Sequence, residues 1–155
     1  MGFLTGKTAI ITGGGRAVLS NGECGSIGYG IATAYAKEGA NLVLTGRNVQ
    51  KLTDAKEELE KKYGIKVLPV QADVSAGSDN EAIVQNVVKQ AIDTFGRIDV
   101  LINNAQASAS GVTIADHTTE QFDLSVYSGL YAAFYYMKAC YPYLKETKGS
   151  VINFA

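Results

Sequence analysis

Short runs of β-branched and other apolar residues alternate along the chain with longer stretches in which apolar residues recur at helical spacing. The short runs predict buried strands, at residues 7–12, 41–45, 66–71, 97–104 and 150–155. The longer stretches predict amphipathic helices, most of them closed by a glycine, at residues 27–38, 48–64, 80–96 and 119–144. Strands and helices therefore alternate from one end of the chain to the other.

This alternation determines the fold class that we predict. Parallel strands joined through helices need right-handed crossovers, and these place helices on both faces of one sheet. We therefore expect an α/β protein with a doubly wound parallel sheet. We also expect residues 1–155 to form a single domain, because 155 residues are too few for two domains of ordinary size.

Composition and charge exclude several classes of function. The chain has 14 basic and 15 acidic side chains and a formal net charge of -1, which argues against a nucleic-acid partner. No apolar run is long enough to span a membrane and no targeting signal begins the chain, so we expect no membrane partner and a cytoplasmic location. Cys24 and Cys140 lie far apart without metal-ligand spacing, which predicts reduced thiols and no metal site.

Seven glycines lie within residues 12–32, directly after the first predicted strand. A loop between a strand and its helix brings backbone N–H groups and the positive end of the helix to one place, which attracts pyrophosphate. Glycine permits this close approach because it has no side chain. The glycine pattern alone leaves open a plain surface loop.

Several motifs at the ends of the predicted strands, taken together, resemble the short-chain dehydrogenase/reductase family over the whole chain. They are Thr12-Gly13 with Gly25-Ser26-Ile27-Gly28, then Asp73-Val74, then Asn103-Asn104-Ala105-Gln106. The resemblance implies a Rossmann fold that binds a nicotinamide dinucleotide. It implies a phosphate cradle at Gly13, Ser26, Ile27 and Gly28, an adenine site at Asp73 and Val74, and a nicotinamide-side ribose site at Asn104, Ala105 and Gln106.

The glycine segment departs from the family pattern in two ways. Ser26 stands where the family has a glycine, and its small hydroxyl keeps the cradle open and is itself able to donate to a phosphate. An insertion around residues 17–24 separates the two halves of the motif, and we expect it to form an excursion near the cofactor phosphates rather than an element of its own. The stretch "SIGYGIA" also resembles enoyl-acyl-carrier-protein reductases, so that enzyme class remains an alternative.

The end of the second predicted strand indicates which dinucleotide binds. Proteins that prefer NAD usually carry a carboxylate there, whereas this chain has Thr45-Gly46-Arg47-Asn48. The guanidinium of Arg47, with Asn48 beside it, predicts binding of a 2′-phosphate, and Arg16 is a candidate second cation. We therefore expect NADP as the cofactor. The missing carboxylate also argues against a methyltransferase.

Hydride transfer to a carbonyl needs a proton donor. The resemblance implies a Ser, a Tyr and a Lys four residues after the Tyr, all following the fifth strand, at whose end Ala155 stands. We therefore assign no catalytic residue and expect this chain to be the cofactor half of a longer oxidoreductase, inactive alone. Tyr141 with Lys145, and Tyr131 with Lys138, match family spacings but precede that strand, so we interpret both pairs as non-catalytic.

The last predicted helix carries further departures. Gly129 occupies a position at which the family often has an Asn of the proton relay, so a relay of that kind is not expected here. His117 lies in a polar loop and is interpreted as solvated or as a helix cap. The resemblance implies that this helix pairs between subunits, which predicts a homo-oligomer of the longer protein. A group of tyrosines on the helix is therefore interpreted as core and subunit-interface packing: Tyr127, Tyr131, Tyr135 and Tyr136.

Small side chains in residues 106–113 leave room above the nicotinamide for a bulky alcohol or ketone. With the unusual N-N-A-Q sequence, this loop resembles bacterial hydroxysteroid dehydrogenases that act on bile acids, with the 12α-hydroxyl as the expected position. We therefore expect an NADP(H)-dependent oxidoreductase that acts on a small-molecule secondary alcohol or ketone, a hydroxysteroid. A non-catalytic NADP-binding module is the alternative if the chain is complete.

Overall fold

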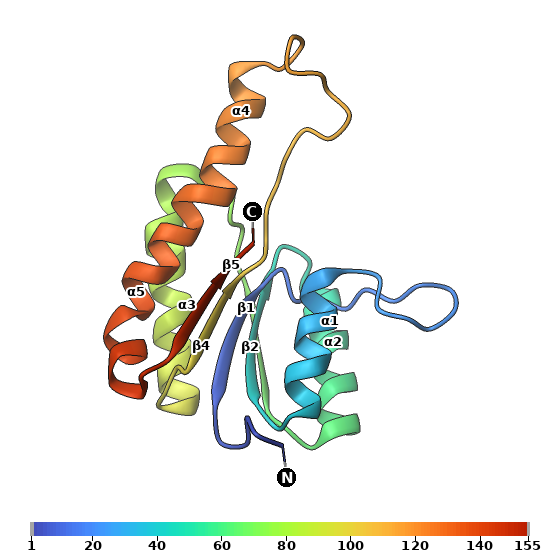
Figure 1. Ribbon diagram of the computed structural model, residues 1–155, viewed down its shortest axis with the longest axis vertical. Helices are drawn as coiled ribbons and strands as arrows, with labels where there is room; N and C mark the ends of the chain where they lie inside the picture. The colour runs from blue at the N-terminus through green and yellow to red at the C-terminus, as the bar shows by residue number, and fades with distance from the viewer. Residues whose placement is uncertain (1, 155) are drawn as a thin grey trace.

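A computed structural model describes residues 2–154, which form one parallel sheet between two layers of helices (Figure 1). The end of the last predicted strand at Ala155 lies outside the described residues. In space the strand order is β3-β2-β1-β4-β5, with all neighbours parallel. The strands are β1 (Thr8–Thr12), β2 (Asn41–Gly46), β3 (Val67–Gln71), β4 (Val100–Asn103) and β5 (Ser150–Asn153).

Helices cover both faces of this sheet, which confirms the predicted doubly wound α/β fold. On one face lie α1 (Ile27–Lys37) and α2 (Val49–Tyr63), and on the other lie α3 (Asn80–Phe95) and α5 (Ala132–Thr147) (Figure 1). A single 3-10 turn, η1 (Gly77–Asp79), precedes α3. The described helices begin and end within a few residues of the predicted ranges, except for the last one.

The last predicted helix is helical from Thr119 to Thr147 but is not one regular α-helix. It comprises α4 (Thr119–Ser125), a π-helical turn η2 (Val126–Tyr131) and α5. The hydroxyl of Ser128 lies 2.7 Å from the carbonyl oxygen of Leu124 and 2.9 Å from the backbone nitrogen of Ala107. The π turn is therefore the place where this helix is bonded to the loop after β4, a contact that periodicity does not reveal.

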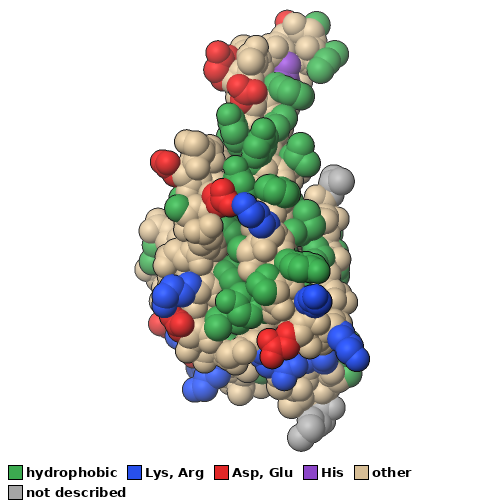
Figure 2. Space-filling model, turned by 90° about the vertical axis from the view of Figure 1, so that its left-hand side faces the viewer, with side chains coloured by type: hydrophobic (Ala, Val, Ile, Leu, Met, Phe, Trp, Pro, Cys, Tyr) green, Lys and Arg blue, Asp and Glu red, His purple; other side chains and the backbone are tan. Residues whose placement is uncertain are grey.

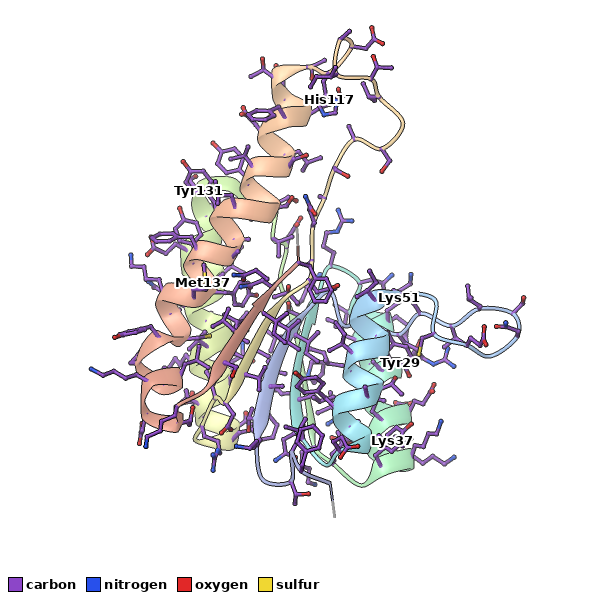
Figure 3. The ribbon with its side chains drawn as sticks, viewed as in Figure 1. Tyr29, Lys37, Lys51, His117, Tyr131 and Met137 are labelled. Carbon is purple, nitrogen blue, oxygen red and sulfur yellow. The ribbon has the colours of Figure 1, made fainter. Side chains whose placement is uncertain are left out.

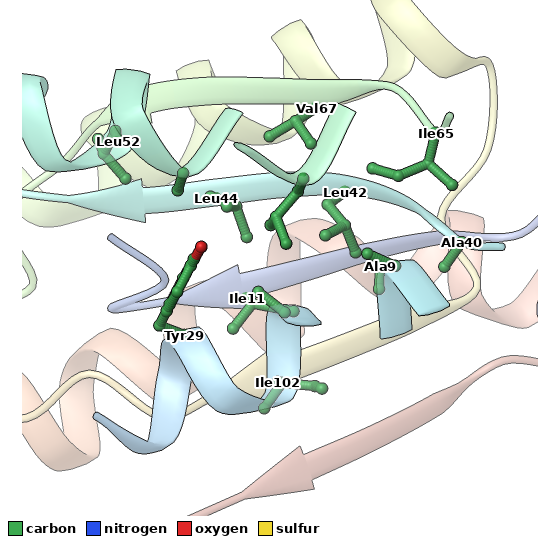
Figure 4. Packing of buried hydrophobic residues seen from close by; sticks show 14 of the residues in the cluster. Ala9, Ile11, Tyr29, Ala40, Leu42, Leu44, Leu52, Ile65, Val67 and Ile102 are labelled. Atoms are coloured by element: carbon green, nitrogen blue, oxygen red, sulfur yellow. The ribbon is translucent and has the colours of Figure 1, made fainter. Parts of the chain in front are cut away.

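The core consists of two apolar clusters, one on each face of the sheet. Successive residues of a strand point to opposite faces, so Ile10 and Val43 pack toward α3 and α5, whereas Ile11 and Leu44 pack toward α1 and α2 (Figure 4). All residues of β1 are buried. β1 carries no charged residue, and its apolar run Ala9, Ile10 and Ile11 is typical of a strand covered on both faces.

Two expectations from composition bear on the described residues. No helix within residues 2–154 has both the length and the apolar character needed to cross a membrane. Cys24 is exposed and Cys140 is buried, and both are free thiols.

Candidate functional site

A pocket of about 270 Å³ lies at the carboxyl ends of the central strands. The order of strands reverses between β1 and β4, and in open α/β sheets ligands bind outside the strand ends at such a switch point. The pocket brings together residues that are far apart in the sequence. The predicted site residues that line it are Gly13, Arg47, Asp73, Val74, Asn104, Ala105 and Gln106.

Thr12, the last residue of β1, positions two residues that line the pocket, Asn104 and Ala105. Its hydroxyl accepts hydrogen bonds from the backbone N–H groups of Asn104 and Ala105, at 3.0 and 2.9 Å. The side-chain amide of Asn104 in turn donates to the carbonyl oxygen of Thr12 at 3.0 Å. These bonds join the ends of β1 and β4, a role for Thr12 that the sequence analysis missed although it quoted this residue within the family motif.

The start of α1 packs against this junction through a glycine. A Cβ atom on Gly28 would lie 2.1 Å from the carbonyl oxygen of Gly13 and 2.6 Å from the side-chain nitrogen of Asn104. Gly13 has a φ of 72°, a left-handed conformation that favours glycine. Glycine at both positions therefore permits the amino end of α1 to reach the switch point.

The other two residues predicted for the cradle form the entry to α1 without lining the pocket. Ser26 is the N-cap of α1, and its hydroxyl accepts a hydrogen bond from the backbone N–H of Tyr29 at 3.4 Å. The side chain of Ile27 is 63% exposed. The hydroxyl that was expected to donate to a phosphate thus has a structural partner in the helix.

Arg16 lies apart from the pocket. Its backbone N–H donates to the carbonyl oxygen of Lys51 at 2.8 Å, and its guanidinium forms an ion pair with Glu58, two turns further along α2. The hydrogen bond from Arg16 lowers the pKa of Glu58 below its ordinary value. The structure therefore does not bring Arg16 and Arg47 together, because Glu58 holds the Arg16 guanidinium on the side of α2.

Residues 17–24 lie outside the helices and strands, as expected, but the expectation that they lie at the strand ends is wrong. The segment closes on itself as a small hairpin, with an antiparallel bridge between Val18 and Cys24 and a 2.8 Å bond from the backbone N–H of Leu19 to the carbonyl oxygen of Glu23. Its tip extends away from the sheet (Figure 1). The segment thus forms hydrogen bonds within itself and does not need the strand ends as partners.

The β2 side of the pocket carries two opposite charges. Arg47 follows β2, and Asp73 follows β3 and accepts two hydrogen bonds from Ser75, at 2.9 Å from its backbone nitrogen and 2.6 Å from its hydroxyl. Burial opposes ionisation of Asp73, but the bonds from Ser75 and the charge of Arg47 hold the pKa of this carboxyl below its ordinary value. Asp73 is therefore an ionised acceptor.

Asn48, which was predicted to bind the cofactor beside Arg47, is the N-cap of α2. Its side chain accepts a hydrogen bond from the backbone N–H of Lys51 at 2.9 Å.

None of the side chains that match catalytic spacings lines the pocket, and Tyr131 lies on the last helical run (Figure 3). Lys138 pairs with Glu81 on α3 at 2.7 Å, and Tyr141 is 62% exposed. Neither Tyr131 nor Tyr141 lines the pocket at the strand ends. His117 lies in the loop before α4, well away from the strand ends (Figure 3).

The tyrosines of the last helix divide into two groups. Tyr136 is buried in the core, and this burial raises the pKa of its phenol to about 12. Tyr135 is partly buried against the same cluster, whereas Tyr127 and Tyr131 are 39% and 44% exposed. Tyr136 and Tyr135 are therefore the core members of this group, whereas the interface part of the interpretation, left to the exposed Tyr127 and Tyr131, stays a prediction.

Comparison with known proteins shows the family to which the chain belongs. The family model described as short chain dehydrogenase matches residues 7–155. The whole chain is 66% identical to a 12alpha-hydroxysteroid dehydrogenase of a Clostridium species, of which it covers 57%. The chain belongs to the short-chain dehydrogenase family. It spans about half the length of the curated relatives that it matches.

Solved structures of short-chain dehydrogenases share the fold. L-sorbose reductase from Gluconobacter frateurii, in complex with NADPH and L-sorbose, is 32% identical with a TM-score of 0.82, over 97% of this chain and 52% of that one. An alcohol dehydrogenase from Thermococcus sibiricus, in complex with 5-hydroxy-NADP, is 29% identical with a TM-score of 0.81, over 94% and 56% of the two chains. The family thus binds a nicotinamide cofactor.

The contact between Gly28 and Gly13 predicts the effect of a single methyl group. Gly28→Ala should destabilise the protein by about 1–3 kcal/mol, because the new Cβ meets backbone atoms that are unable to yield. Gly30→Ala is the matched control on the same helix, where the nearest atom to a Cβ is the Cβ of Cys24 at 3.8 Å. Alanine there should stabilise the helix by up to about 1 kcal/mol.

Urea unfolding of the two variants, made in the protein as its gene encodes it, measures this difference. Equal unfolding midpoints for Gly28→Ala and Gly30→Ala would show that the approach of α1 to β1 is loose, contrary to the structure.

Proposed function

We propose that this protein binds NADP(H) at the strand ends and serves the transfer of a hydride between the nicotinamide and a secondary alcohol or ketone of a hydroxysteroid. The observation that carries the proposal is the pocket at the switch point, lined by Arg47 and Asp73 on one side and by Asn104 and Gln106 on the other. NADP supplies the hydride acceptor when it is bound. The residues of this chain supply its binding and orientation.

Each part of the dinucleotide has a matching feature in the pocket. A glycine-lined junction at the start of α1 suits the pyrophosphate. The ionised Asp73 suits the amine of the adenine, and Val74 offers an apolar surface beside it. The ends of β1 and β4, joined by Thr12, suit the nicotinamide-side ribose.

The 2′-phosphate distinguishes NADP from NAD, and the charges at the end of β2 favour NADP. Arg47 lines the pocket, and no carboxylate follows β2 to bind the ribose hydroxyls or to repel a phosphate. A guanidinium offers several donors to a phosphate in a planar arrangement. The glycines, the charges and the open switch point together fit the cofactor that the family uses.

The proposed substrate is a bile acid, oxidised at its 12α-hydroxyl. The support is the 66% identity to a 12alpha-hydroxysteroid dehydrogenase, and a loop of small side chains that follows β4 beside the pocket. No tyrosine of residues 2–154 lines this pocket to act as a proton donor. We therefore propose that these residues form the cofactor-binding half of the enzyme and do not turn over substrate by themselves. A cytoplasmic location, with reduced thiols at Cys24 and Cys140, completes the proposal.

The test uses two bile acids that differ only in the presence of the 12α-hydroxyl. The protein as its gene encodes it should reduce NADP with the 12α-hydroxylated bile acid and not with the other. The 155-residue chain should bind NADPH without turnover. Binding of NADPH without oxidation of any secondary alcohol by the gene-encoded protein would favour a non-catalytic binding module. Turnover by the 155-residue chain that is lost in Tyr141→Phe would overturn the location of the active site.

The choice of cofactor is tested at Arg47. Arg47→Gln should weaken NADP binding by about 10- to 100-fold, because one charge-assisted contact with the phosphate is lost, and should leave NAD binding nearly unchanged. Lys61→Gln is the matched control, since Lys61 is an exposed cation at the far end of α2. Titration of each variant with NADP and NAD gives the ratio of the two affinities. An unchanged ratio in Arg47→Gln would assign the phosphate to another group.

We propose further that copies of the protein associate through the last helical run. Apolar side chains form a continuous band along this side of the molecule (Figure 2). Several side chains on α4, η2 and α5 are more than half exposed: Phe122, Leu130, Phe134 and Tyr141. Contiguous apolar surface of this kind is typical of a protein interface, and it supports a homo-oligomer.

A charge placed on this band should disrupt the association. Leu130→Glu, at a side chain that is 67% exposed, should shift the protein toward the monomer because the carboxylate would be buried without a partner. Phe3→Glu is the control, since Phe3 is 78% exposed but lies beside Glu38 at the end of α1, on the other face of the sheet. Light scattering during gel filtration measures the mass of each variant. The proposal fails if Leu130→Glu and Phe3→Glu have the same mass as the unmodified protein.

A further inference from the structure

Gln106 lies between two cavities of the molecule. It lines the pocket at the strand ends and also a much smaller cavity beneath η2. Both of its neighbours are held by hydrogen bonds: the N–H of Ala105 donates to the hydroxyl of Thr12 at 2.9 Å, and the N–H of Ala107 donates to the hydroxyl of Ser128 at 2.9 Å. The backbone at Gln106 is therefore fixed from both sides, and only its side chain has freedom to move.

Gly129 supplies the room for that side chain. A Cβ atom on Gly129 would lie 3.3 Å from the side-chain nitrogen of Gln106, 3.7 Å from its Cδ and 3.8 Å from its Cγ. The side chain of Gln106 thus runs along the bare backbone of Gly129. Gly129 lies in the π-helical turn next to Ser128, so the same turn both anchors the loop and opens the space.

Gln106 is an exposed residue, and its amide has no hydrogen-bond partner within residues 2–154. A side-chain amide carries two donor hydrogens and an acceptor oxygen. Arg47 and Asp73 occupy the end of the pocket at β2 and β3, whereas Gln106 follows β4 on the other side of β1. A dinucleotide whose adenosine half lies at Arg47 and Asp73 would therefore extend its other half toward Gln106.

We propose that Gln106 and Gly129 form an interlocked pair, in which the bare backbone of Gly129 lets the Gln106 amide hydrogen-bond the nicotinamide half of the bound dinucleotide. This inference rests on the proposed binding of NADP. It assigns to Gly129 a task in cofactor binding that Gly129 performs only through Gln106.

Two ligands separate this inference from the proposed function. NADP contains both halves, whereas adenosine 2′,5′-bisphosphate contains only the adenosine half with the same phosphate. Gln106→Met keeps the length of the side chain and removes the amide. It should weaken binding of NADP by about fivefold, the effect of one neutral hydrogen bond, and leave binding of the bisphosphate unchanged.

Calorimetric titration of the gene-encoded protein gives both affinities, with Gln85→Met on α3 as a control that should alter neither. Equal NADP affinity for Gln106→Met and the unmodified protein would overturn the inference while leaving the proposed function intact. Failure of the unmodified protein to bind either ligand would overturn the proposed function and the pair with it.

A second substitution tests the interlock. Gly129→Ala should weaken NADP binding when Gln106 is present, because the new methyl group displaces the amide. It should have no further effect in the Gln106→Met background. Thermal unfolding of each variant confirms that it folds. An equal loss of NADP affinity in both backgrounds would show that Gly129 supports only the helix, and would overturn the interlock.

Discussion

The hydroxyl of Thr12 joins the two strand ends between which the candidate site is built. It accepts from two successive backbone N–H groups of the chain after β4, and Asn104 completes the junction from its side chain. A hydroxyl has two acceptor positions, so one buried threonine satisfies both N–H groups where β1 and β4 part. This junction fixes the positions of Asn104 and Ala105 at the switch point of the sheet.

The glycines around this junction serve packing as much as phosphate binding. Gly28 brings α1 against Gly13, and a Cβ on Gly14 would lie 2.8 Å from a side-chain carbon of Leu44. Gly15 lies against α2, where a Cβ atom on it would be 3.2 Å from the Cβ atom of Lys51. The segment is therefore pressed between β2, α2 and the end of β4. A surface loop with the same composition would not need glycine at these positions.

Hydrogen-bond and ion-pair partners decide which charged side chains lie at the pocket. Arg47 and Asp73 remain at the pocket, whereas Arg16 is paired with Glu58 on α2. Among residues 2–154, Arg47 is thus the cation that lines the pocket, whereas Arg16, just before the hairpin, is bonded to α2. The sequence around Arg16 does not reveal whether its guanidinium lies at the pocket or on α2. The partner that decides this, Glu58, is 42 residues away along the chain.

The sequence by itself determined the order of strands and helices along the chain, the fold class and most of the residues that line the pocket. These follow from local periodicity and from motifs at strand ends, which a parallel sheet gathers at one edge. Only the tertiary structure decided the position of Arg16, the hairpin at residues 17–24, the π turn in the last helix and the contact of Gln106 with Gly129. Each of these depends on hydrogen bonds or space shared between segments, and periodicity along one segment carries no information about the other.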